Sequence, residues 1–215
     1  MHYTSVLFDL DGTLLDTLGD LTAAMNRTLT RHGLPERTRQ QMRAALGNGA
    51  RRLMELSVPA GTDGALFETL LAEYNADYAA HCRIETAPYP GVAALLLKLH
   101  AQGRKLAIVS NKPDEAVRAL RAEFFADTVP IAVGEKQGIR RKPAPDTLLA
   151  AMEKLGADPD KTVFVGDSEV DIATARAANL PCISVLWGFR DRDVLEQAGA
   201  QHFAADIAQL QALLG

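Results

Sequence analysis

Two carboxylates placed two residues apart, Asp9 and Asp11, follow the first apolar run and are well suited to chemistry. The run at residues 5–10 is apolar and β-branched enough to predict a buried strand. Gly12 opens a turn, which we expect to let Asp11 lean over Asp9. Because nearby acids repel, one pKa should rise unless a cation intervenes. The pair suits a carboxylate nucleophile beside a carboxylic acid, with a divalent metal holding the charges together.

An ordinary turn is the alternative for this pair, since Asp and Gly are common turn residues. Other polar segments also follow predicted strands. Ser110, Asn111 and Lys112 end the run 105–110, and Asp167 follows the run 162–165. In a parallel sheet these strand ends meet at one edge, so the residues should converge.

Ser110 and Asn111 stand where a loop meets the start of a predicted helix at 113–123, which makes a natural anion site. Capping of that helix is the alternative. Lys142 precedes another predicted helix, where a cation is disfavoured by the helix dipole. An anion between Lys142 and the dipole would relieve this conflict, whereas a solvated surface lysine would need none.

Asp167 and Asp171 add two carboxylates to the same edge. Ser168 and Asp171 also match a capping box, so Asp171 has a structural alternative. Four acids at one edge require a hard cation, and an oxygen-only donor set favours Mg²⁺ over zinc.

The elements that must position these residues change type along the chain. Residues 16–85 carry helical stripes and no strand signal, including a capping box predicted for Thr17 and Asp20. Residues 86–215 alternate helix and strand, which indicates right-handed βαβ crossovers. We therefore expect an α/β fold, a three-layer α/β/α Rossmann-like parallel sheet formed by residues 1–15 and 86–215, with a small helical cap at 16–85.

Composition limits the function classes. A net charge of −4 argues against a nucleic-acid surface. Cys82 and Cys182 have neither metal-ligand spacing nor a disulfide framework. The sequence shows no membrane segment or signal peptide, so we expect a cytoplasmic protein without a membrane partner, as a monomer or weak dimer.

The chemistry-bearing residues resemble the motifs of the haloacid dehalogenase-like hydrolase superfamily, in the same order. These motifs are FDLDGTL at 8–14, VSN at 109–111, Lys142 within RKPAPD, and VGDSEVD at 165–171. The helical insert resembles that family's cap. GNGA at 47–50, SNKP at 110–113 and WG at 187–188 further resemble the phosphoglycolate phosphatases and their near relatives. The resemblance covers nearly the whole chain.

The resemblance implies that Asp9 attacks phosphorus and becomes an aspartyl phosphate. Asp11 would protonate the leaving alcohol and then deprotonate the hydrolytic water. Mg²⁺ would be held by Asp9, the main-chain carbonyl of Asp11 and Asp167, with Asp171 in support. Relatives that remove halogen lack the second aspartate, so Asp11 favours phosphoryl transfer.

The resemblance also implies that Ser110, Asn111 and Lys142 hold the phosphoryl oxygens. In the cap, Asn48 and Gly49 either touch the substrate or form a simple turn between helices. Arg51 and Arg52 either reach a substrate carboxylate or form a solvated face, and the relatives are not expected to carry this pair. Trp187 either lines the site or fills a gap in the core.

The expected function is Mg²⁺-dependent hydrolysis of a small phosphorylated metabolite, with phosphoglycolate the leading candidate. A sugar-phosphate mutase or a pyrophosphatase of the same superfamily is the alternative. A phosphoaccepting signalling module is more remote, because its acceptor aspartate lies further along the chain and it has no helical insert.

Overall fold

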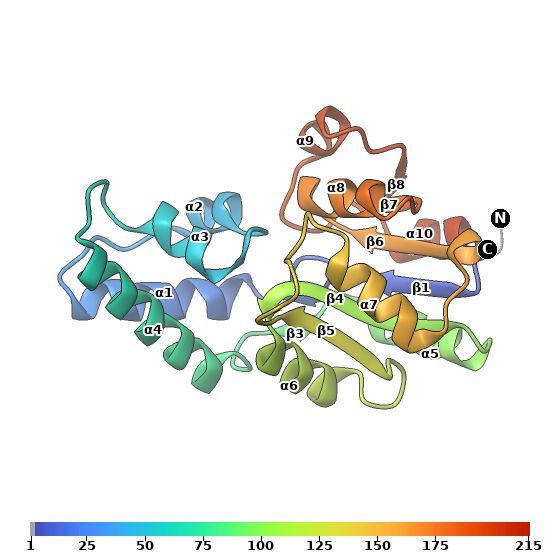
Figure 1. Cartoon of the computed structure of the whole chain (residues 1–215), viewed down its shortest axis with the longest axis horizontal. Coiled ribbons are helices and arrows are strands. Elements are labelled where there is room, and N and C mark those ends of the chain that lie inside the picture. Colours follow the sequence, from blue (N-terminus) through green and yellow to red (C-terminus); the bar gives the residue numbers. More distant parts are fainter. Residues whose placement is uncertain (1–2) are drawn as a thin grey trace. The chain divides into compact units, whose positions relative to one another are not determined.

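The computed structural model describes residues 3–215, and the chain divides into two compact units. Of the described residues, 3–15 and 88–215 form the first unit, and 16–87 form the second. Figure 1 shows the first unit as a sheet covered by helices and the second as helices. No helix among the residues described is long and apolar enough to cross a membrane.

The first unit contains a six-stranded sheet in the order β5-β4-β1-β6-β7-β8, and every neighbouring pair is parallel. Its strands are β1 (Ser5–Phe8), β4 (Lys105–Pro113), β5 (Ile131–Glu135), β6 (Thr162–Gly166), β7 (Cys182–Val185) and β8 (His202–Ala204). β1 is wholly buried between β4 and β6, which explains its continuous apolar run. The predicted α/β fold with a parallel sheet is confirmed.

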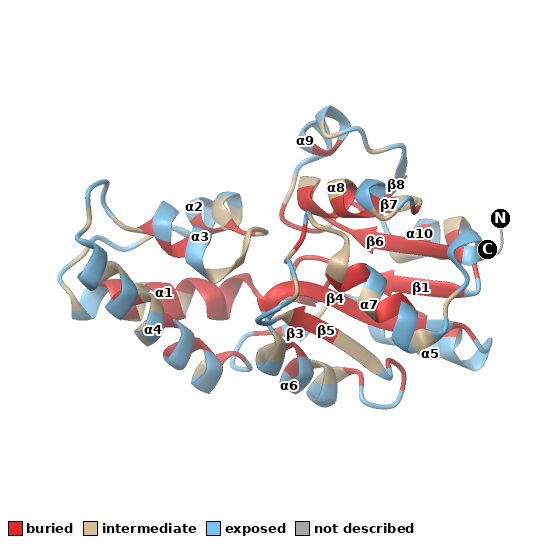
Figure 2. Cartoon of the chain, viewed as in Figure 1, coloured by how far each residue is buried: buried red, intermediate tan, exposed pale blue. Residues whose placement is uncertain are grey.

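Helices cover both faces of this sheet. They are α5 (Val92–Ala101), α6 (Asp114–Phe124), α7 (Asp146–Leu155), α8 (Glu169–Ala177), α9 (Arg192–Gln197) and α10 (Ile207–Leu214). Leu7, Val109 and Phe164 of the strands share a buried cluster with Leu148 of α7 and Ala175 of α8. In Figure 1, α7 and α8 lie in front of the sheet, with α5 and α10 behind it. Figure 2 shows the strands between these layers as the most buried part.

The second unit contains α1 (Leu18–Arg31), α2 (Arg39–Ala45), α3 (Gly49–Ser57) and α4 (Gly64–His81). The chain leaves and re-enters the first unit through two short paired strands, β2 (Leu15–Asp16) and β3 (Ala87–Pro88). Asp77 of α4 is buried and accepts hydrogen bonds from Arg27 and Arg31 of α1. This ion-pair network ties the two long helices together.

The predicted capping box at the start of α1 is wrong. The Thr17 side chain makes no capping hydrogen bond. The Asp20 carboxylate instead accepts the backbone N–H groups of Ile84, Glu85 and Thr86 at 2.9–3.0 Å. Backbone N–H groups far along the chain thus bind the Asp20 carboxylate, which local spacing had assigned to the cap of α1. Its three bonds hold the segment that follows α4.

Candidate active site

The carboxyl ends of three neighbouring strands carry the candidate site. Asp9 follows β1 directly, and its N–H donates to the Val165 carbonyl of β6 at 2.9 Å. Asp167 follows β6, while Ser110 lies within β4, which is longer than the sequence predicted. Since β4, β1 and β6 are adjacent and parallel, the fold brings these segments to one edge of the sheet.

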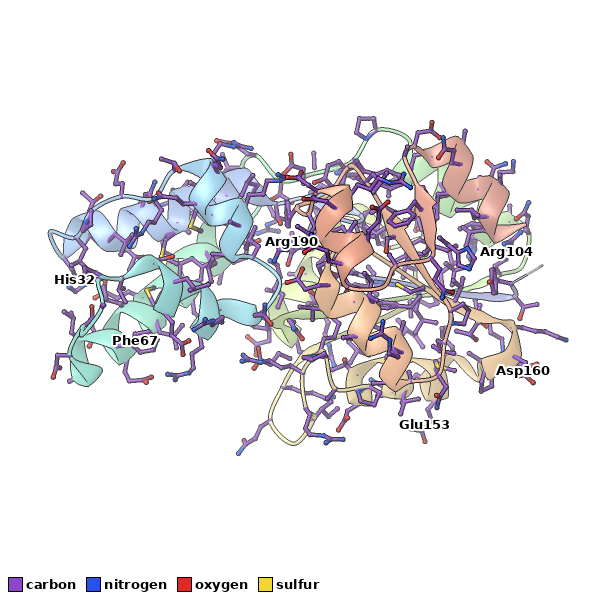
Figure 3. All side chains as sticks on the ribbon, turned by 90° about the horizontal axis from the view of Figure 1, so that it is seen from above. His32, Phe67, Arg104, Glu153, Asp160 and Arg190 are labelled. Carbon is purple, nitrogen blue, oxygen red and sulfur yellow. The ribbon has the colours of Figure 1, made fainter. Side chains whose placement is uncertain are left out.

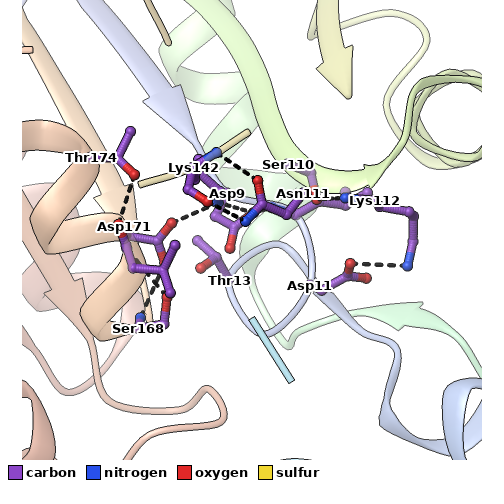
Figure 4. A network of polar contacts seen from close by, with 12 residues as sticks. Asp9, Asp11, Thr13, Ser110, Asn111, Lys112, Lys142, Ser168, Asp171 and Thr174 are labelled. Carbon is purple, nitrogen blue, oxygen red and sulfur yellow. Dashed lines mark hydrogen bonds and ion pairs between the residues drawn. The ribbon is translucent and has the colours of Figure 1, made fainter. Parts of the chain in front are cut away.

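Lys142 lies at the centre of the acidic residues. Its Nζ is 2.9 Å from Asp9 Oδ1 and 2.7 Å from Asp171 Oδ1, as Figure 4 shows. Only 2% of the Lys142 side chain is exposed, so solvent screens these ion pairs little. The alternative of a solvated surface lysine is therefore wrong. The attraction of the two carboxylates offsets the unfavourable interaction of the Lys142 ammonium with the dipole at the start of α7.

Asn111 fixes the backbone of Lys142. Its Oδ1 accepts the Lys142 N–H at 2.8 Å, and its Nδ2 donates to the Lys142 carbonyl at 2.9 Å. Neither Ser110 nor Asn111 caps α6, whose N-cap residue is Pro113. Ser110 Oγ instead accepts the Lys112 N–H at 3.3 Å. The helix-cap alternative is wrong for both residues, because the Asn111 side chain binds the Lys142 backbone instead.

Asp167 is enclosed by two loops of the first unit. Its Oδ1 accepts the Thr13 hydroxyl at 2.9 Å, and its Oδ2 accepts the Phe189 N–H at 2.7 Å. Gly12 and Gly188 permit this close approach: a Cβ on either would lie within 2.5 Å of Asp167 atoms. The carboxylate is therefore held at both oxygens while Asp167 is almost fully buried.

Asp171 combines its predicted structural role with a place in the cluster. Ser168 and Asp171 form the expected capping box of α8. Asp171 Oδ2 accepts the Ser168 hydroxyl at 2.6 Å, and Oδ1 accepts Lys142 Nζ. A Cβ on Gly166 would lie 2.4 Å from the Asp171 Cβ, so the glycine that ends β6 lets α8 pack closely there. The two interpretations of Asp171 are therefore compatible.

The cluster holds three acidic groups, Asp9, Asp167 and Asp171, and one basic group, Lys142. Burial, reinforced by Asp171 and opposed by Lys142, raises the pKa of Asp9 well above its usual range. Burial and Asp171 raise the pKa of Asp167 to about 7. Burial disfavours the Lys142 ammonium, but Asp171 and Asp9 outweigh it and raise the pKa of Lys142. Lys142 is therefore charged near neutral pH.

One oxygen from each of Asp9, Asp167 and Asp171 lies within 4.8 Å of the other two. When all three buried carboxylates are ionised they outweigh the one ammonium, and a cation would compensate the excess negative charge. Because all the donors are oxygens, the set fits a hard divalent cation.

The Asp11 carboxylate lies apart from this cluster. Its Oδ2 is 2.9 Å from Lys112 Nζ, and Figure 4 shows the pair separated from Asp9. The expectation that Asp11 leans over Asp9 is therefore wrong for this conformation. A buried ammonium attracts the carboxylate, whereas Asp9 carries the same charge as Asp11 when ionised. Asp11 Oδ1 is buried without a hydrogen-bond partner among the described residues.

Of the predicted cap residues, Arg51 and Arg52 have partners within the second unit, whereas Asn48 and Gly49 lie at the start of α3. Asn48 is the N-cap of α3 without a side-chain capping bond, and Gly49 is the first residue of that helix. Arg51 pairs with both oxygens of Glu68 at 2.8 and 2.9 Å and lies over the ring of Phe67, labelled in Figure 3. Arg52 pairs with Glu55 at 2.9 Å on the same helix. Arg51 thus ties α3 to α4.

A sequence profile of the haloacid dehalogenase-like hydrolases matches residues 6–185, a span that contains Asp9, Ser110, Lys142 and Asp167. The match covers well over half of the chain and includes the whole cluster around Lys142. The chain belongs to the haloacid dehalogenase-like hydrolase family.

Relatives of this hydrolase include two proteins named phosphoglycolate phosphatase. One, from Xanthomonas campestris pv. campestris (strain 8004), is 35% identical over 187 residues, covering 86% of this chain and 84% of the relative. The other, from Rhodospirillum rubrum, is 35% identical over 219 residues, covering 98% and 90%. An N-acetylmuramic acid 6-phosphate phosphatase from Pseudomonas aeruginosa is 31% identical over 208 residues, covering 96% and 90%.

The fold of this hydrolase matches solved structures along its length. A crystal structure from Lactobacillus delbrueckii subsp. bulgaricus, provisionally named phosphoglycolate phosphatase, has a TM-score of 0.94 and 36% identity, covering 100% of this chain and 99% of that one. A hydrolase from Pseudomonas syringae has a TM-score of 0.80 and 27% identity, covering 98% and 97%. The prediction of a phosphoric monoester hydrolase is confirmed by these relatives.

The contacts around Asp167 were the part of the site that sequence reasoning missed. Thr13 lies inside the first motif, but its spacing gave no sign that its hydroxyl reaches Asp167. Phe189 acts through its backbone N–H, which every residue except proline provides, so its side-chain type carries no signal. Gly188, directly after an apolar strand and a tryptophan, was the available indication of close backbone approach.

Proposed function

We propose that this hydrolase releases inorganic phosphate from a small phosphomonoester, with phosphoglycolate as the first candidate substrate. The observation that carries the proposal is the buried group of three carboxylates around Lys142. The names of the relatives from X. campestris and R. rubrum support the choice of phosphoglycolate. N-acetylmuramic acid 6-phosphate is a second candidate, because a relative of 31% identity acts on it by name.

In the first half-reaction, a carboxylate oxygen of Asp9 attacks phosphorus in line with the leaving oxygen. The phosphorus–oxygen ester bond breaks, Asp11 gives its proton to the leaving alkoxide, and Asp9 carries the phosphoryl group. For this step Asp11 must exchange its contact with Lys112 for one with the leaving oxygen.

In the second half-reaction, Asp11 takes a proton from water while the water oxygen attacks phosphorus. The bond to Asp9 breaks, which restores both carboxyl groups and yields inorganic phosphate. Lys142 and Ser110 hold the phosphoryl oxygens, whose charge must be balanced in both transition states. Asn111 keeps the Lys142 backbone in place.

We further propose that Asp9 and Asp167 hold Mg²⁺, with Asp171 as a nearby charge that also orients Lys142. Mg²⁺ in this position would neutralise charge on the carboxylates and on the phosphoryl oxygens. The buried oxygen-only cluster fits this ion. The raised pKa values of Asp9 and Asp167 fit it too, because burial and the nearby Asp171 disfavour both ionised carboxylates and a cation would offset these effects.

The test is phosphate release from phosphoglycolate, N-acetylmuramic acid 6-phosphate, β-glucose 1-phosphate and pyrophosphate, each with Mg²⁺ and with chelator. We expect phosphoglycolate to have the highest kcat/KM, and only with Mg²⁺. Isomerisation of the sugar phosphate without phosphate release would make the protein a mutase. Preferential cleavage of pyrophosphate would make it a pyrophosphatase.

The intermediate needs a separate measurement. Acid quenching after mixing with substrate labelled in the phosphoryl group should trap label on the wild-type protein, in a bond that hydroxylamine cleaves. Asp9→Asn is the matched control and should trap none. Label trapped equally on Asp9→Asn would exclude Asp9 as the nucleophile.

A further inference from the structure

The loop between β7 and α9 approaches Asp167 from the side of the first-motif turn, and its contacts form a connected set. We propose that Trp187 in this loop is a positioning residue for the Asp167 carboxylate, acting through Thr13, and thereby sets the affinity of the site for a divalent cation. The inference rests on the metal site of the proposed function, and it assigns a role to Trp187, for which the sequence left two alternatives open.

A chain of two hydrogen bonds connects Trp187 to Asp167. The indole Nε1–H donates to the Thr13 carbonyl at 3.1 Å, and the Thr13 hydroxyl donates to Asp167 Oδ1 at 2.9 Å. Thr13 is 1% exposed, so it cannot replace either partner with water at little cost. Trp187 therefore acts on Asp167 through Thr13, whose backbone carbonyl accepts the indole hydrogen bond.

The same loop also holds the second oxygen of Asp167. The Phe189 N–H donates to Oδ2 at 2.7 Å. Each carboxylate oxygen has two lone-pair directions, so one donor on each still leaves room for a cation. A carboxylate restrained at both oxygens cannot rotate freely about its bond to Cβ. It is therefore oriented before a cation arrives, so that binding costs less side-chain conformational entropy.

Gly188 brings the loop to within this distance. A Cβ there would lie 2.3 Å from the Asp167 Cβ and 2.5 Å from the Gly12 carbonyl oxygen. Both neighbours are atoms that cannot swing away as the end of a flexible side chain can. The Trp187–Phe189 segment therefore packs directly against Asp167.

Space filling is the alternative role for Trp187, which is only half-buried. Trp187→Phe separates the two roles, since it keeps an aromatic ring and removes the indole donor. Arg190→Gln is the matched control: Arg190, labelled in Figure 3, ties the same loop to Glu169 of α8 at 2.7 Å. That variant loosens the loop without removing the bond to Thr13.

The experiment titrates Mn²⁺ into the metal-free full chain and follows the free ion by electron paramagnetic resonance, so no turnover is involved. Loss of a hydrogen bond behind a metal ligand typically costs about 10–100-fold in affinity. We expect Trp187→Phe to raise the Mn²⁺ Kd by about tenfold. Arg190→Gln should raise the Kd by clearly less, because it keeps the bond from Trp187 to Thr13.

A double-variant cycle tests the chain of bonds itself. Thr13→Val removes the hydroxyl that Trp187 is proposed to position, so adding Trp187→Phe to it should weaken Mn²⁺ binding little further. Thr13→Ser keeps the hydroxyl and should retain most of the affinity. If Trp187→Phe fails to fold by circular dichroism, the comparison of Thr13→Val with Thr13→Ser tests the bond nearest to Asp167.

The outcomes separate the two proposals. A wild-type chain that binds no Mn²⁺ would refute the metal site of the proposed function. A wild-type chain that binds Mn²⁺, together with an unchanged Kd in Trp187→Phe, would overturn the positioning role alone. Equal weakening in Trp187→Phe and Arg190→Gln would also overturn it, because general loosening of the loop would then explain the loss.

Discussion

Replacing Lys142 with methionine tests how the buried charges depend on one another. Met has nearly the length of Lys but no charge, so the change removes the ammonium and little volume. At an effective dielectric constant near 20, two opposite charges about 4 Å apart attract by about 4 kcal/mol. Lys142 makes two such pairs, with Asp9 and Asp171, and the cost of burying the ammonium offsets part of the gain.

We expect Lys142→Met to lower the free energy of unfolding of the metal-free protein by about 3–5 kcal/mol at pH 8. That range is typical when one partner of a buried ion pair is removed and the other charge is left uncompensated. Turnover should fall by at least about 10²-fold, as when one donor to a developing charge is removed.

The loss of stability should depend on pH, in a direction set by the raised pKa values. Burial raises the pKa of Asp167 to about 7 and that of Asp9 above its usual range, so the folded state binds these protons more tightly than the unfolded state. Stability therefore declines as pH rises from about 4 through the folded-state pKa values. Removing Lys142 raises these values further, so the deficit should be larger at pH 8 than at pH 5.

The assay is urea denaturation of wild type and Lys142→Met at pH 5 and pH 8, with chelator present. Lys98→Met is the control, because Lys98 is exposed on α5. A deficit below about 1 kcal/mol at pH 8 would contradict the reasoning, since it would lie under the range for broken buried pairs. A deficit that does not change between the two pH values would show that the carboxylates do not depend on the ammonium as described.

Asp9→Asn should abolish turnover while circular dichroism stays unchanged, because the amide is nearly isosteric but is a poor nucleophile; near-normal phosphate release would contradict the assignment. Mg²⁺ at about one hundred times its Kd should raise the free energy of unfolding by about 2.7 kcal/mol. The affinity of the protein for Mg²⁺, measured by calorimetry, should fall below about pH 7, where protons compete for Asp167. Chelator that changes neither activity nor melting temperature would refute the site. Asp77→Asn should lower the free energy of unfolding of the helical unit by about 1.5–3 kcal/mol above pH 5. Although burial opposes it, Arg27 and Arg31 lower the pKa of Asp77, so the stability difference between wild type and variant should shrink as pH falls below about 4. A stability difference that stays constant on acid denaturation would be inconsistent with these ion pairs. Arg51→Ala should reduce hydrolysis of phosphoglycolate and of neutral esters by similar factors, because Arg51 ties α3 to α4; a selective loss on phosphoglycolate would assign it to the substrate carboxylate instead.

The sequence determined five of the six strands of the main sheet and most of the helices, because their signals are local. The apolar runs at β1, β4 and β6 are typical of strands buried on both faces, and glycine and proline marked the ends of α1 and α2. The strand at β8 and the helices α9 and α10 were not predicted: β8 has three residues and α9 six, too short for a clear periodic pattern.

The sequence also determined which side chains meet at the edge of the sheet, since parallel topology sends every strand end to the same side. It did not determine how those side chains pair. Asn111 binds the Lys142 backbone, and Asp11 pairs with Lys112. In the helical unit, the Asp20 carboxylate of α1 likewise binds the N–H groups of 84–86 and not those of its own helix. Each partner lies far along the chain from the residue that it binds. Such choices depend on distances of a few ångströms between separate segments, and tertiary packing alone fixes those distances.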